Sequence, residues 1–324
     1  MDKELHIIVD SGDLDEIANA HSYGIARGTT LNPSHIYNYR KVKGQGFDII
    51  QYVMDVIRKS TNNSEHGPVS LEVIGITEDD MVEQGLRMYE RFSPYGKVWI
   101  KIPVNPSMDP NNPVTMDGLK AIERLSKRGI PVNCTLIHTP EQALAAAESG
   151  AKVVSPFAGR LDDYLRESIG LQLGRDFTKE GYFPSEGLVY NGQRVNYNGI
   201  VSGVDLVRLI RTGLDDHEFK DDVYVLAASV RNPRQLEEMA CLTGADMATL
   251  PFATIQYMRE NGINRVPRDR KGPEKDPANV STYVFDRKRG LYHPKTLEGM
   301  IKFDQDGNAV PEYRELFSAL QYSQ

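Results

Sequence analysis

Hydrophobic positions along the chain fall into two alternating patterns. Short runs rich in β-branched residues are each followed by a longer segment in which apolar residues recur every three or four positions. Eight of the short runs fit strands, at residues 6–9, 24–29, 69–73, 98–103, 132–137, 152–157, 223–228 and 247–250. Segments with helical spacing include residues 48–59, 78–92, 115–127, 140–149, 204–212 and 233–242. The pattern therefore predicts a strand followed by a helix, repeated eight times.

Repeated strand and helix pairs most simply close into a (β/α)8 TIM barrel, which we expect for residues 1–258. Two helices have good start signals, because Thr139 precedes Pro140 and Asn232 precedes Pro233, as expected for a cap followed by the first helical position. A doubly wound open sheet is the alternative architecture. The chain contains neither G-x-G-x-x-G nor G-x-x-x-x-G-K-[ST], so the usual nucleotide-binding reasons for an open sheet are missing.

Two segments interrupt the alternation. Residues 170–199, between the sixth and seventh predicted strands, are rich in Gly, Asn and Tyr and indicate a long insertion. Residues 259–324 form a C-terminal extension whose first part is dense in charge and proline, which is typical of a poorly ordered segment or one wrapped over the surface. A short helix is expected within residues 311–320.

The fourth predicted strand, VWIKIP, contains a lysine among apolar residues. Strand alternation turns Trp99 and Lys101 to one face and Val98, Ile100 and Ile102 to the other. A lysine at the mouth of a strand can extend its ammonium group to water, which is the simpler interpretation. A desolvated lysine has a lowered pKa and can act as a neutral amine in Schiff-base chemistry. The neighbouring strands decide between these interpretations.

The same alternation applied to other strands sends several polar side chains into one space. The inward residues are Asp10, Glu72, Asn133, Thr135 and Ser155. Each has an ordinary explanation alone, as a cap, a turn residue or a surface ion pair. Together with Lys101, two carboxylates and small hydrogen-bonding groups can catalyse carbonyl chemistry through an imine. We therefore predict an active site at the carboxyl ends of the strands.

Two arginines follow late strands of the predicted barrel. Arg160 comes after the sixth strand and Arg231 after the seventh. Loops after late barrel strands often bind phosphate, and the planar guanidinium group suits that task. The alternative is that each arginine pairs with a surface carboxylate.

Composition and charge narrow the function further. The formal net charge is −7, and no basic tract suggests a nucleic-acid surface. Two cysteines and seven histidines show no disulfide framework and no metal-binding spacing, so we expect no metal site. No signal-peptide or membrane-spanning run occurs, which favours a cytoplasmic protein without a membrane partner. The sequence leaves open whether the chain forms a homo-oligomer.

Seven strand-end motifs, taken in order, resemble those of transaldolases and the related fructose-6-phosphate aldolases. They are VDSGD, TTLNPS, SLEV, WIKIP, NCTLI, SPFAGR and AASVRN. The resemblance covers residues 5–257 and implies a class I aldolase barrel that needs no metal or organic cofactor and acts on sugar phosphates. It departs from the family at Leu31, where a threonine is usual, and it offers no counterpart to residues 170–199 or to the tail.

The resemblance also implies roles for individual residues. Lys101 would form the Schiff base with the ketose phosphate donor, and Asp10 would take the C4 hydroxyl proton as the C3–C4 bond breaks. Glu72 and Thr135 would move protons during imine formation. The residues left to bind the substrate would be Thr30, Asn32, Asn133, Ser155 and Phe157, with Arg160, Ser229 and Arg231 at the phosphate.

Within the resemblance, certain positions separate a transferase from a lyase. Glu72, Asn133 with Thr135, and Phe157 follow the transaldolase pattern. We therefore predict transfer of a dihydroxyacetone unit from a ketose phosphate to an aldose phosphate. The alternatives are an aldolase that releases dihydroxyacetone, a related enzyme for a different sugar, and a sugar-phosphate binding barrel without turnover.

Overall fold

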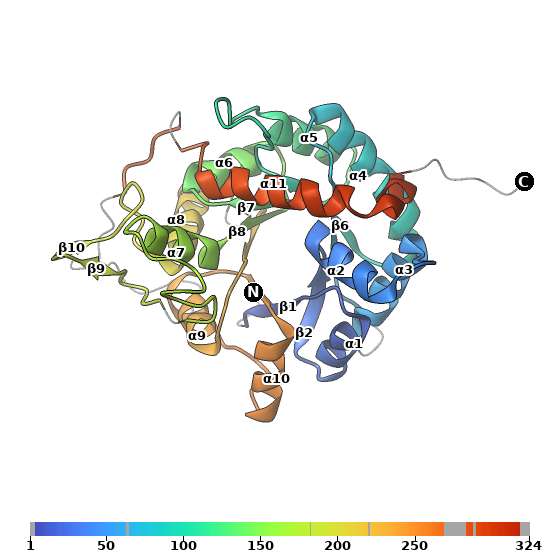
Figure 1. Cartoon of the computed structure of the whole chain (residues 1–324), viewed down its shortest axis with the longest axis horizontal. Helices are drawn as coiled ribbons and strands as arrows, with labels where there is room; N and C mark the ends of the chain where they lie inside the picture. The colour runs from blue at the N-terminus through green and yellow to red at the C-terminus, as the bar shows by residue number, and fades with distance from the viewer. Residues whose placement is uncertain are drawn as a thin grey trace, which may run out of the picture.

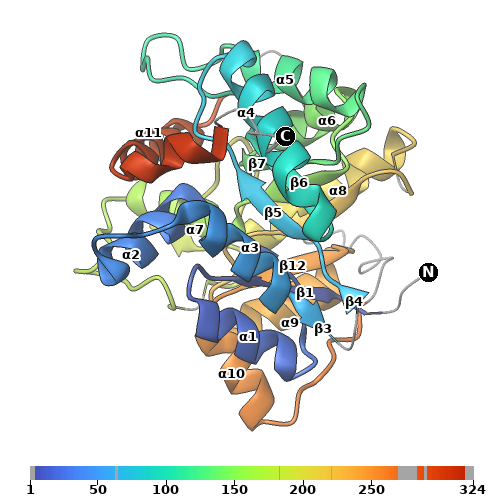
Figure 2. The ribbon, with the colours of Figure 1, turned by 90° about the vertical axis from the view of Figure 1, so that its right-hand side faces the viewer.

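The computed structural model describes residues 4–62, 65–181, 183–219, 221–268, 283–287 and 290–317. Eight parallel strands close into a barrel in the order β1-β12-β11-β8-β7-β6-β5-β2 (Figures 1 and 2). They are β1 (His6–Asp10), β2 (Ala26–Thr30), β5 (Val69–Glu72), β6 (Val98–Pro103), β7 (Val132–Ile137), β8 (Val153–Pro156), β11 (Tyr224–Ala227) and β12 (Met247–Leu250). The closed parallel barrel confirms the predicted (β/α)8 fold and excludes the open sheet.

Helices surround the barrel (Figure 1). Their bounds are α1 (Leu14–Ser22), α2 (Pro33–Lys43), α3 (Ile49–Lys59), α4 (Glu78–Phe92), α5 (Asp117–Ser126), α6 (Pro140–Glu148), α7 (Ala158–Glu167), α8 (Gly203–Asp216), α9 (Pro233–Leu242), α10 (Phe252–Glu260) and α11 (Pro294–Asn308), with 3-10 turns at Ser93–Tyr95 and Pro311–Phe317. The predicted caps are present, because the side chains of Thr139 and Asn232 accept hydrogen bonds from the backbone N–H groups of Gln142 and Gln235.

The two faces of each barrel strand have different partners, as the alternation predicts. On β6, Val98, Ile100 and Ile102 are buried in the main hydrophobic core between barrel and helices. Trp99 points the other way and packs inside the barrel on a small cluster of Ile8, Val153, Leu226 and Met247. This apolar cluster fills the barrel interior and excludes water from it. The polar residues lie further along the strands, next to this cluster.

The insertion lies between α7 and α8, within the long connection from β8 to β11. It carries a short exposed hairpin of β9 (Val189–Tyr190) and β10 (Gln193–Arg194). A second small hairpin pairs β3 (Thr61–Asn62) with β4 (Glu65–His66). The insertion packs on the barrel through Phe183, whose ring lies 4.8 Å from the guanidinium of Arg166 on α7. The backbone carbonyl of Lys179 accepts a hydrogen bond from Arg231, so the insertion reaches the end of β11.

The C-terminal extension contains a helix that the sequence pattern did not predict. Figure 1 shows α11 running across the molecule in front of the barrel, from the side of α7 to the side of α2. Its buried residues include Thr296, Gly299, Met300 and Phe303. The expected short helix is present as the 3-10 turn Pro311–Phe317. Much of the segment expected to be poorly ordered, at 269–282 and 288–289, lies outside the described residues.

Candidate active site

Three adjacent strands place polar residues at the same level inside the barrel. Glu72 on β5 pairs in register with Lys101 on β6, and Lys101 pairs with Asn133 on β7. Residues paired across parallel strands point to the same side of the sheet. On the other side of β5, Asp10 on β1 pairs with Thr30 on β2, which is the neighbour of β5. The register thus brings the predicted residues of five strands to one end of the barrel.

Lys101 forms a buried ion pair with Glu72. Its Nζ lies 2.9 Å from Oε2 of Glu72, and the exposed fractions of the two side chains are 5% and 1%. The ammonium group also donates to Oγ1 of Thr30 and to the carbonyl oxygen of Leu31, each at 3.3 Å. Burial raises the pKa of Glu72, and Lys101 opposes that shift. The lysine is therefore buried rather than extended to water.

The contact with Leu31 explains why the family departure at this position leaves the site intact. The Leu31 side chain is fully buried in the core outside the site. Only its backbone carbonyl meets Lys101. Because every residue supplies that carbonyl, leucine can replace threonine here without loss of the contact.

Small polar groups line the barrel wall beside Lys101. Oδ1 of Asn133 accepts a hydrogen bond of 2.6 Å from the Ser155 hydroxyl, and Nδ2 donates to Ser70. The hydroxyl of Thr135 is buried and has no hydrogen-bond partner within the described residues. A buried hydroxyl without a partner costs free energy, and this one faces the cavity, where a bound molecule can satisfy it.

Asp10 lies at the carboxyl end of β1, next to a histidine that sequence reasoning missed. Its Oδ1 is 3.8 Å from Nε2 of His35, in the first turn of α2. Asn32 caps the same helix, with Oδ1 accepting from the His35 N–H at 3.0 Å and Nδ2 lying 3.4 Å from His35 Nε2. The spacing from Asn32 could have revealed this histidine, because a residue three positions after a helix cap lies beside that cap.

Arg160 is held between two aromatic rings. The guanidinium carbon lies 5.1 Å from the Phe157 ring centroid and 5.4 Å from that of Phe303 on α11. Burial lowers the pKa of Arg160, with nearby charges as smaller causes. No ion pair or hydrogen bond to its guanidinium occurs in the part of the chain that the structure describes. A desolvated cation without an anion partner is well suited to bind one.

The second predicted arginine has a partner already. Arg231 forms a 2.7 Å ion pair with Asp163 on α7 and donates through Nε to the Ser229 hydroxyl at 3.0 Å. Ser229 has a φ of 62°, a strained conformation for a residue other than glycine, and its N–H donates to Oγ1 of Thr249. Arg231 therefore supports Ser229 from behind and does not itself line the cavity.

These residues surround a cavity of about 90 Å³ at the mouth of the barrel. Its lining comprises Asp10, Thr30, Asn32, Lys101, Asn133, Thr135, Ser155, Phe157, Arg160, Leu226, Ala228, Ser229, Thr249 and Phe303. Of the twelve residues predicted from the sequence, ten line the cavity, while Glu72 lies beside Lys101 and Arg231 beside Ser229. Sequence reasoning missed Thr249, which shares the inward face of its strand with Met247, and Phe303, which comes from the unpredicted α11.

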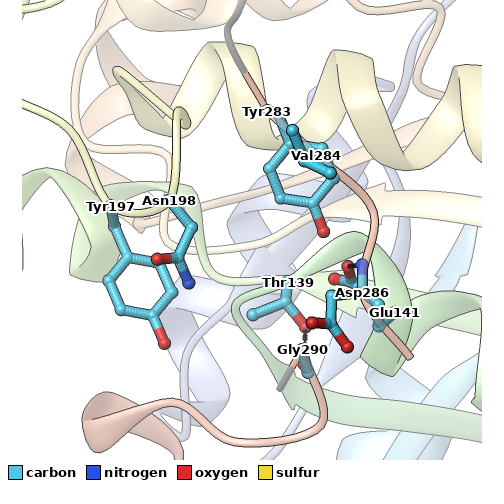
Figure 3. Close-up of a pocket in the computed structure, with 8 residues that line it drawn as sticks. All are labelled: Thr139, Glu141, Tyr197, Asn198, Tyr283, Val284, Asp286 and Gly290. Atoms are coloured by element: carbon cyan, nitrogen blue, oxygen red, sulfur yellow. Dashed lines mark hydrogen bonds between the residues drawn. The ribbon is translucent and has the colours of Figure 1, made fainter. Parts of the chain in front are cut away.

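A separate cavity of about 320 Å³ lies where the insertion and the tail meet the start of α6 (Figure 3). Thr139 donates to the carbonyl of Gly290, and a Glu141 carboxylate oxygen accepts from the N–H of Asp286 at 2.8 Å. Figure 3 shows Glu141 beside Asp286, across the cavity from Tyr197. These contacts attach the tail to the start of α6 just before α11 begins. None of the residues predicted for the site lines this cavity.

The described residues contain neither a metal-binding cluster nor a helix that could span a membrane. No group of three or more His, Cys, Asp and Glu side chains among them could hold a metal ion. None of their helices combines the length and the apolar character that crossing a membrane requires.

Comparison with known proteins agrees with the barrel fold. A family model described as transaldolase/fructose-6-phosphate aldolase matches residues 7–312. A probable transaldolase of Desulfatibacillum aliphaticivorans is 34% identical over 254 residues, which cover 78% of this chain and 90% of the relative. One from Symbiobacterium thermophilum is 32% identical, covering 82% of this chain and 96% of the relative, and one from Thermoplasma acidophilum is 29% identical, covering 94% and 96%. The chain therefore belongs to the transaldolase/fructose-6-phosphate aldolase family.

Proposed function

We propose that this protein is a transaldolase, which transfers a dihydroxyacetone unit from a ketose phosphate to an aldose phosphate through a Schiff base on Lys101. The observation that carries the proposal is the buried pair of Lys101 and Glu72 at the edge of a cavity that also contains Asp10 and Arg160. A binding protein has no need for a buried amine, because burying an ammonium group costs free energy.

The pair of Glu72 and Lys101 supports formation of a reactive amine. Attack on a ketone requires a neutral amine, and the proton must go elsewhere. At 2.9 Å the ammonium group can pass its proton to Glu72, whose raised pKa favours the protonated carboxyl. The transfer leaves the net charge of the buried pair unchanged, so no charge has to enter or leave the barrel. The protonated carboxyl can then assist loss of water from the carbinolamine, together with the Thr135 hydroxyl.

Asp10 is suited to the cleavage step. With the donor bound as an imine on Lys101, Asp10 takes the proton of the C4 hydroxyl and the C3–C4 bonding electrons move into the imine. An aldose phosphate leaves, and the three-carbon enamine stays on Lys101. Attack of that enamine on an acceptor aldehyde reverses these steps, with Asp10 returning the proton to the new hydroxyl. Thr30, Asn32, Asn133 and Ser155 supply hydrogen bonds for the hydroxyl groups of the bound unit.

Arg160 is the main candidate for the phosphate group. Its guanidinium faces the cavity and has no competing carboxylate partner within the described residues, whereas Arg231 is paired with Asp163. The hydroxyl of Ser229, positioned by Arg231, supplies a further hydrogen bond. Phe157 holds the Arg160 side chain by its ring. Phosphorylated sugars are therefore the proposed substrates.

Reductive trapping tests the covalent step. Incubation with fructose 6-phosphate and borohydride, followed by peptide mass spectrometry, should add the reduced donor or its three-carbon remnant at Lys101. The matched control is Lys152→Arg, which changes an exposed lysine beside another barrel strand. This variant should form the adduct at Lys101 to the same extent as wild type. A wild-type protein that gains no adduct at Lys101 contradicts the proposal.

A second measurement separates the transferase from the lyase. Glu72, Asn133 with Thr135, and Phe157 follow the transaldolase pattern, so the enamine should persist until an acceptor arrives. With erythrose 4-phosphate present, product should form at every turnover, and without an acceptor free dihydroxyacetone should accumulate far more slowly. Equal rates of dihydroxyacetone release with and without an acceptor indicate an aldolase.

A further inference from the structure

His35 occupies a fixed position beside Asp10. It lies in the first turn of α2, and the exposed fraction of its side chain is 20%, against 32% for Asp10. The backbone of Gly12 packs directly on it, since a Cβ at Gly12 would come within 2.8 Å of the His35 Cβ. The helix cap holds it from the other side, through the bond between its N–H and Asn32. The imidazole therefore has little freedom to turn away from Asp10.

The hydrogen bonds of Asn32 determine which nitrogen of His35 carries the proton. Because the Asn32 carbonyl oxygen accepts from the backbone N–H of His35, the amide group that faces Nε2 must be the NH2. Nε2 then presents its lone pair as an acceptor, and the proton of the neutral ring is on Nδ1. The same lone pair lies 3.8 Å from Oδ1 of Asp10.

The charges around His35 leave the ring neutral near pH 7. Burial lowers the pKa of His35 and is the largest cause, while Asp10 and Glu16 raise it and Lys101 lowers it. The helix α11, which packs on α2, contributes Asp306, but this carboxylate is bound by the Ser34 hydroxyl and by Lys302. The contact of Nε2 with the Asn32 amide is long, at 3.4 Å, so Asp10 can take over this lone pair. Because the neutral ring accepts through Nε2, Asp10 can form this hydrogen bond only when it carries a proton.

Asp10 lies in the wall between two cavities. One is the proposed substrate cavity, and the other, of about 590 Å³, is lined by Asp10, Gly12 and His35 with residues of α1 and α2. Within the described residues the Asp10 carboxylate accepts no hydrogen bond. A catalytic carboxylate between two cavities needs a neighbour to hold it in one orientation, and His35 is placed for that role.

On the basis of the proposed function, we propose that His35 is a positioning residue for Asp10, which accepts through Nε2 a hydrogen bond from the Asp10 carboxyl group once that group has taken the substrate proton. Within this hydrogen bond the proton stays on Asp10, and the imidazole remains neutral. The bond stabilises the state between cleavage and transfer, in which the enamine is on Lys101 and the C4 hydroxyl proton is on Asp10. When the new C–C bond forms, the proton returns to the product hydroxyl and the bond to His35 is lost.

Three variants test this role. His35→Leu removes the acceptor, and His35→Gln keeps a neutral acceptor near the position of Nε2. The matched control His217→Leu changes an exposed histidine that directly follows α8. Each variant is assayed for transfer from fructose 6-phosphate to erythrose 4-phosphate between pH 5 and 9. Each is also assayed for the rate of borohydride-trapped adduct and for melting temperature.

We expect His35→Leu to lower kcat about tenfold, the size of one lost hydrogen bond, with KM within about threefold of wild type. The acidic limb of its pH–rate profile should move to lower pH, because the lone pair no longer opposes the carboxylate form of Asp10. His35→Gln should recover most of kcat, and the rate of adduct formation should stay within about twofold in every variant. The control should match wild type in all measurements.

Several outcomes overturn the proposal. If His35→Leu keeps the wild-type kcat and pH profile while the adduct forms normally, the role of His35 is wrong and the transaldolase function stands. If both His35 variants lose activity equally with a lower melting temperature and an unshifted profile, the residue is only structural. If wild type itself forms no adduct at Lys101, the proposed function fails and this role fails with it.

Discussion

Replacing Arg160 with methionine should weaken substrate binding without lowering the stability of the free protein. The guanidinium lies between Phe157 and Phe303 at 5.1 and 5.4 Å, without an ion pair among the described residues. Two charge-assisted hydrogen bonds to a phosphate contribute about 3–4 kcal/mol, since the desolvation of the arginine has already occurred during folding. At about 1.4 kcal/mol per decade, kcat/KM for fructose 6-phosphate should fall roughly 100- to 1000-fold. Most of the loss should appear in KM, because the phosphate is distant from the reacting carbons.

The free protein should respond differently to the same substitution. A buried charge without a partner costs several kcal/mol, and two cation–π contacts return about 1–2 kcal/mol each. Arg160→Met should therefore leave the free energy of unfolding unchanged or raise it by about 1–2 kcal/mol. The control Arg124→Met removes a partly exposed arginine that pairs with Glu78 and Asp79, so it should change stability little and leave activity intact.

Steady-state kinetics with two donors and chemical denaturation measure both effects. Unphosphorylated fructose should react with Arg160→Met at nearly the wild-type rate, because that donor never used the guanidinium group. An equal loss of kcat/KM for fructose and for fructose 6-phosphate would refute the assignment of Arg160 to the phosphate. A large fall in unfolding free energy would show that the arginine stabilises the fold and is not held ready for an anion.

Three further substitutions test other features of the structure. Glu72→Gln keeps a hydrogen-bond acceptor for Lys101 but cannot take its proton, so the rate of adduct formation in rapid-quench trapping should fall about 100-fold, and an unchanged rate excludes the proposed proton transfer. Burial lowers the pKa of His293 to about 3, so the unfolded chain binds the extra proton first and stability falls as pH decreases from about 6.5. His293→Asn keeps the cap of α11 without a titrating ring. Between pH 6 and 4 the unfolding free energy of this variant, measured in urea, should fall less steeply than that of wild type, with slopes that differ by about 1 kcal/mol per pH unit. Equal slopes for the two proteins count against this source of acid sensitivity. In Gly299→Ala the new Cβ would come within 2.7 Å of an Arg160 nitrogen, so KM for phosphorylated donors should rise about tenfold while fructose is unaffected.

The sequence predicted the barrel because each strand has a strong local signal. Val98, Ile100 and Ile102 alternate with Trp99 and Lys101, and in the structure they face the helices while Trp99 and Lys101 face inward. Closure of the barrel then places inward residues of distant strands together. This is why Glu72, Lys101 and Asn133, each ambiguous alone, lie in one row.

Other parts of the site depend on contacts that no local pattern reveals. The helix α11 contains two glycines and many charged residues, so its sequence pattern alone does not predict a buried helix. Its inner positions are buried only because the helix packs on the barrel mouth and α2. Phe303 was therefore not predicted. Arg231 was predicted beside the phosphate, but the position of its partner Asp163 on α7 depends on how that helix packs, which sequence alone does not give.

The position of α11 has a consequence for the order in which the site is completed during synthesis. A nascent chain that ends just after Leu250 has all eight barrel strands, yet it lacks Phe303, which forms one side of the Arg160 site. Until residues 294–308 follow, the barrel mouth is open and Arg160 has one aromatic neighbour instead of two. The barrel and the complete site therefore form at different points of synthesis, and we expect the proposed donor to bind at full strength only after the last helix has docked.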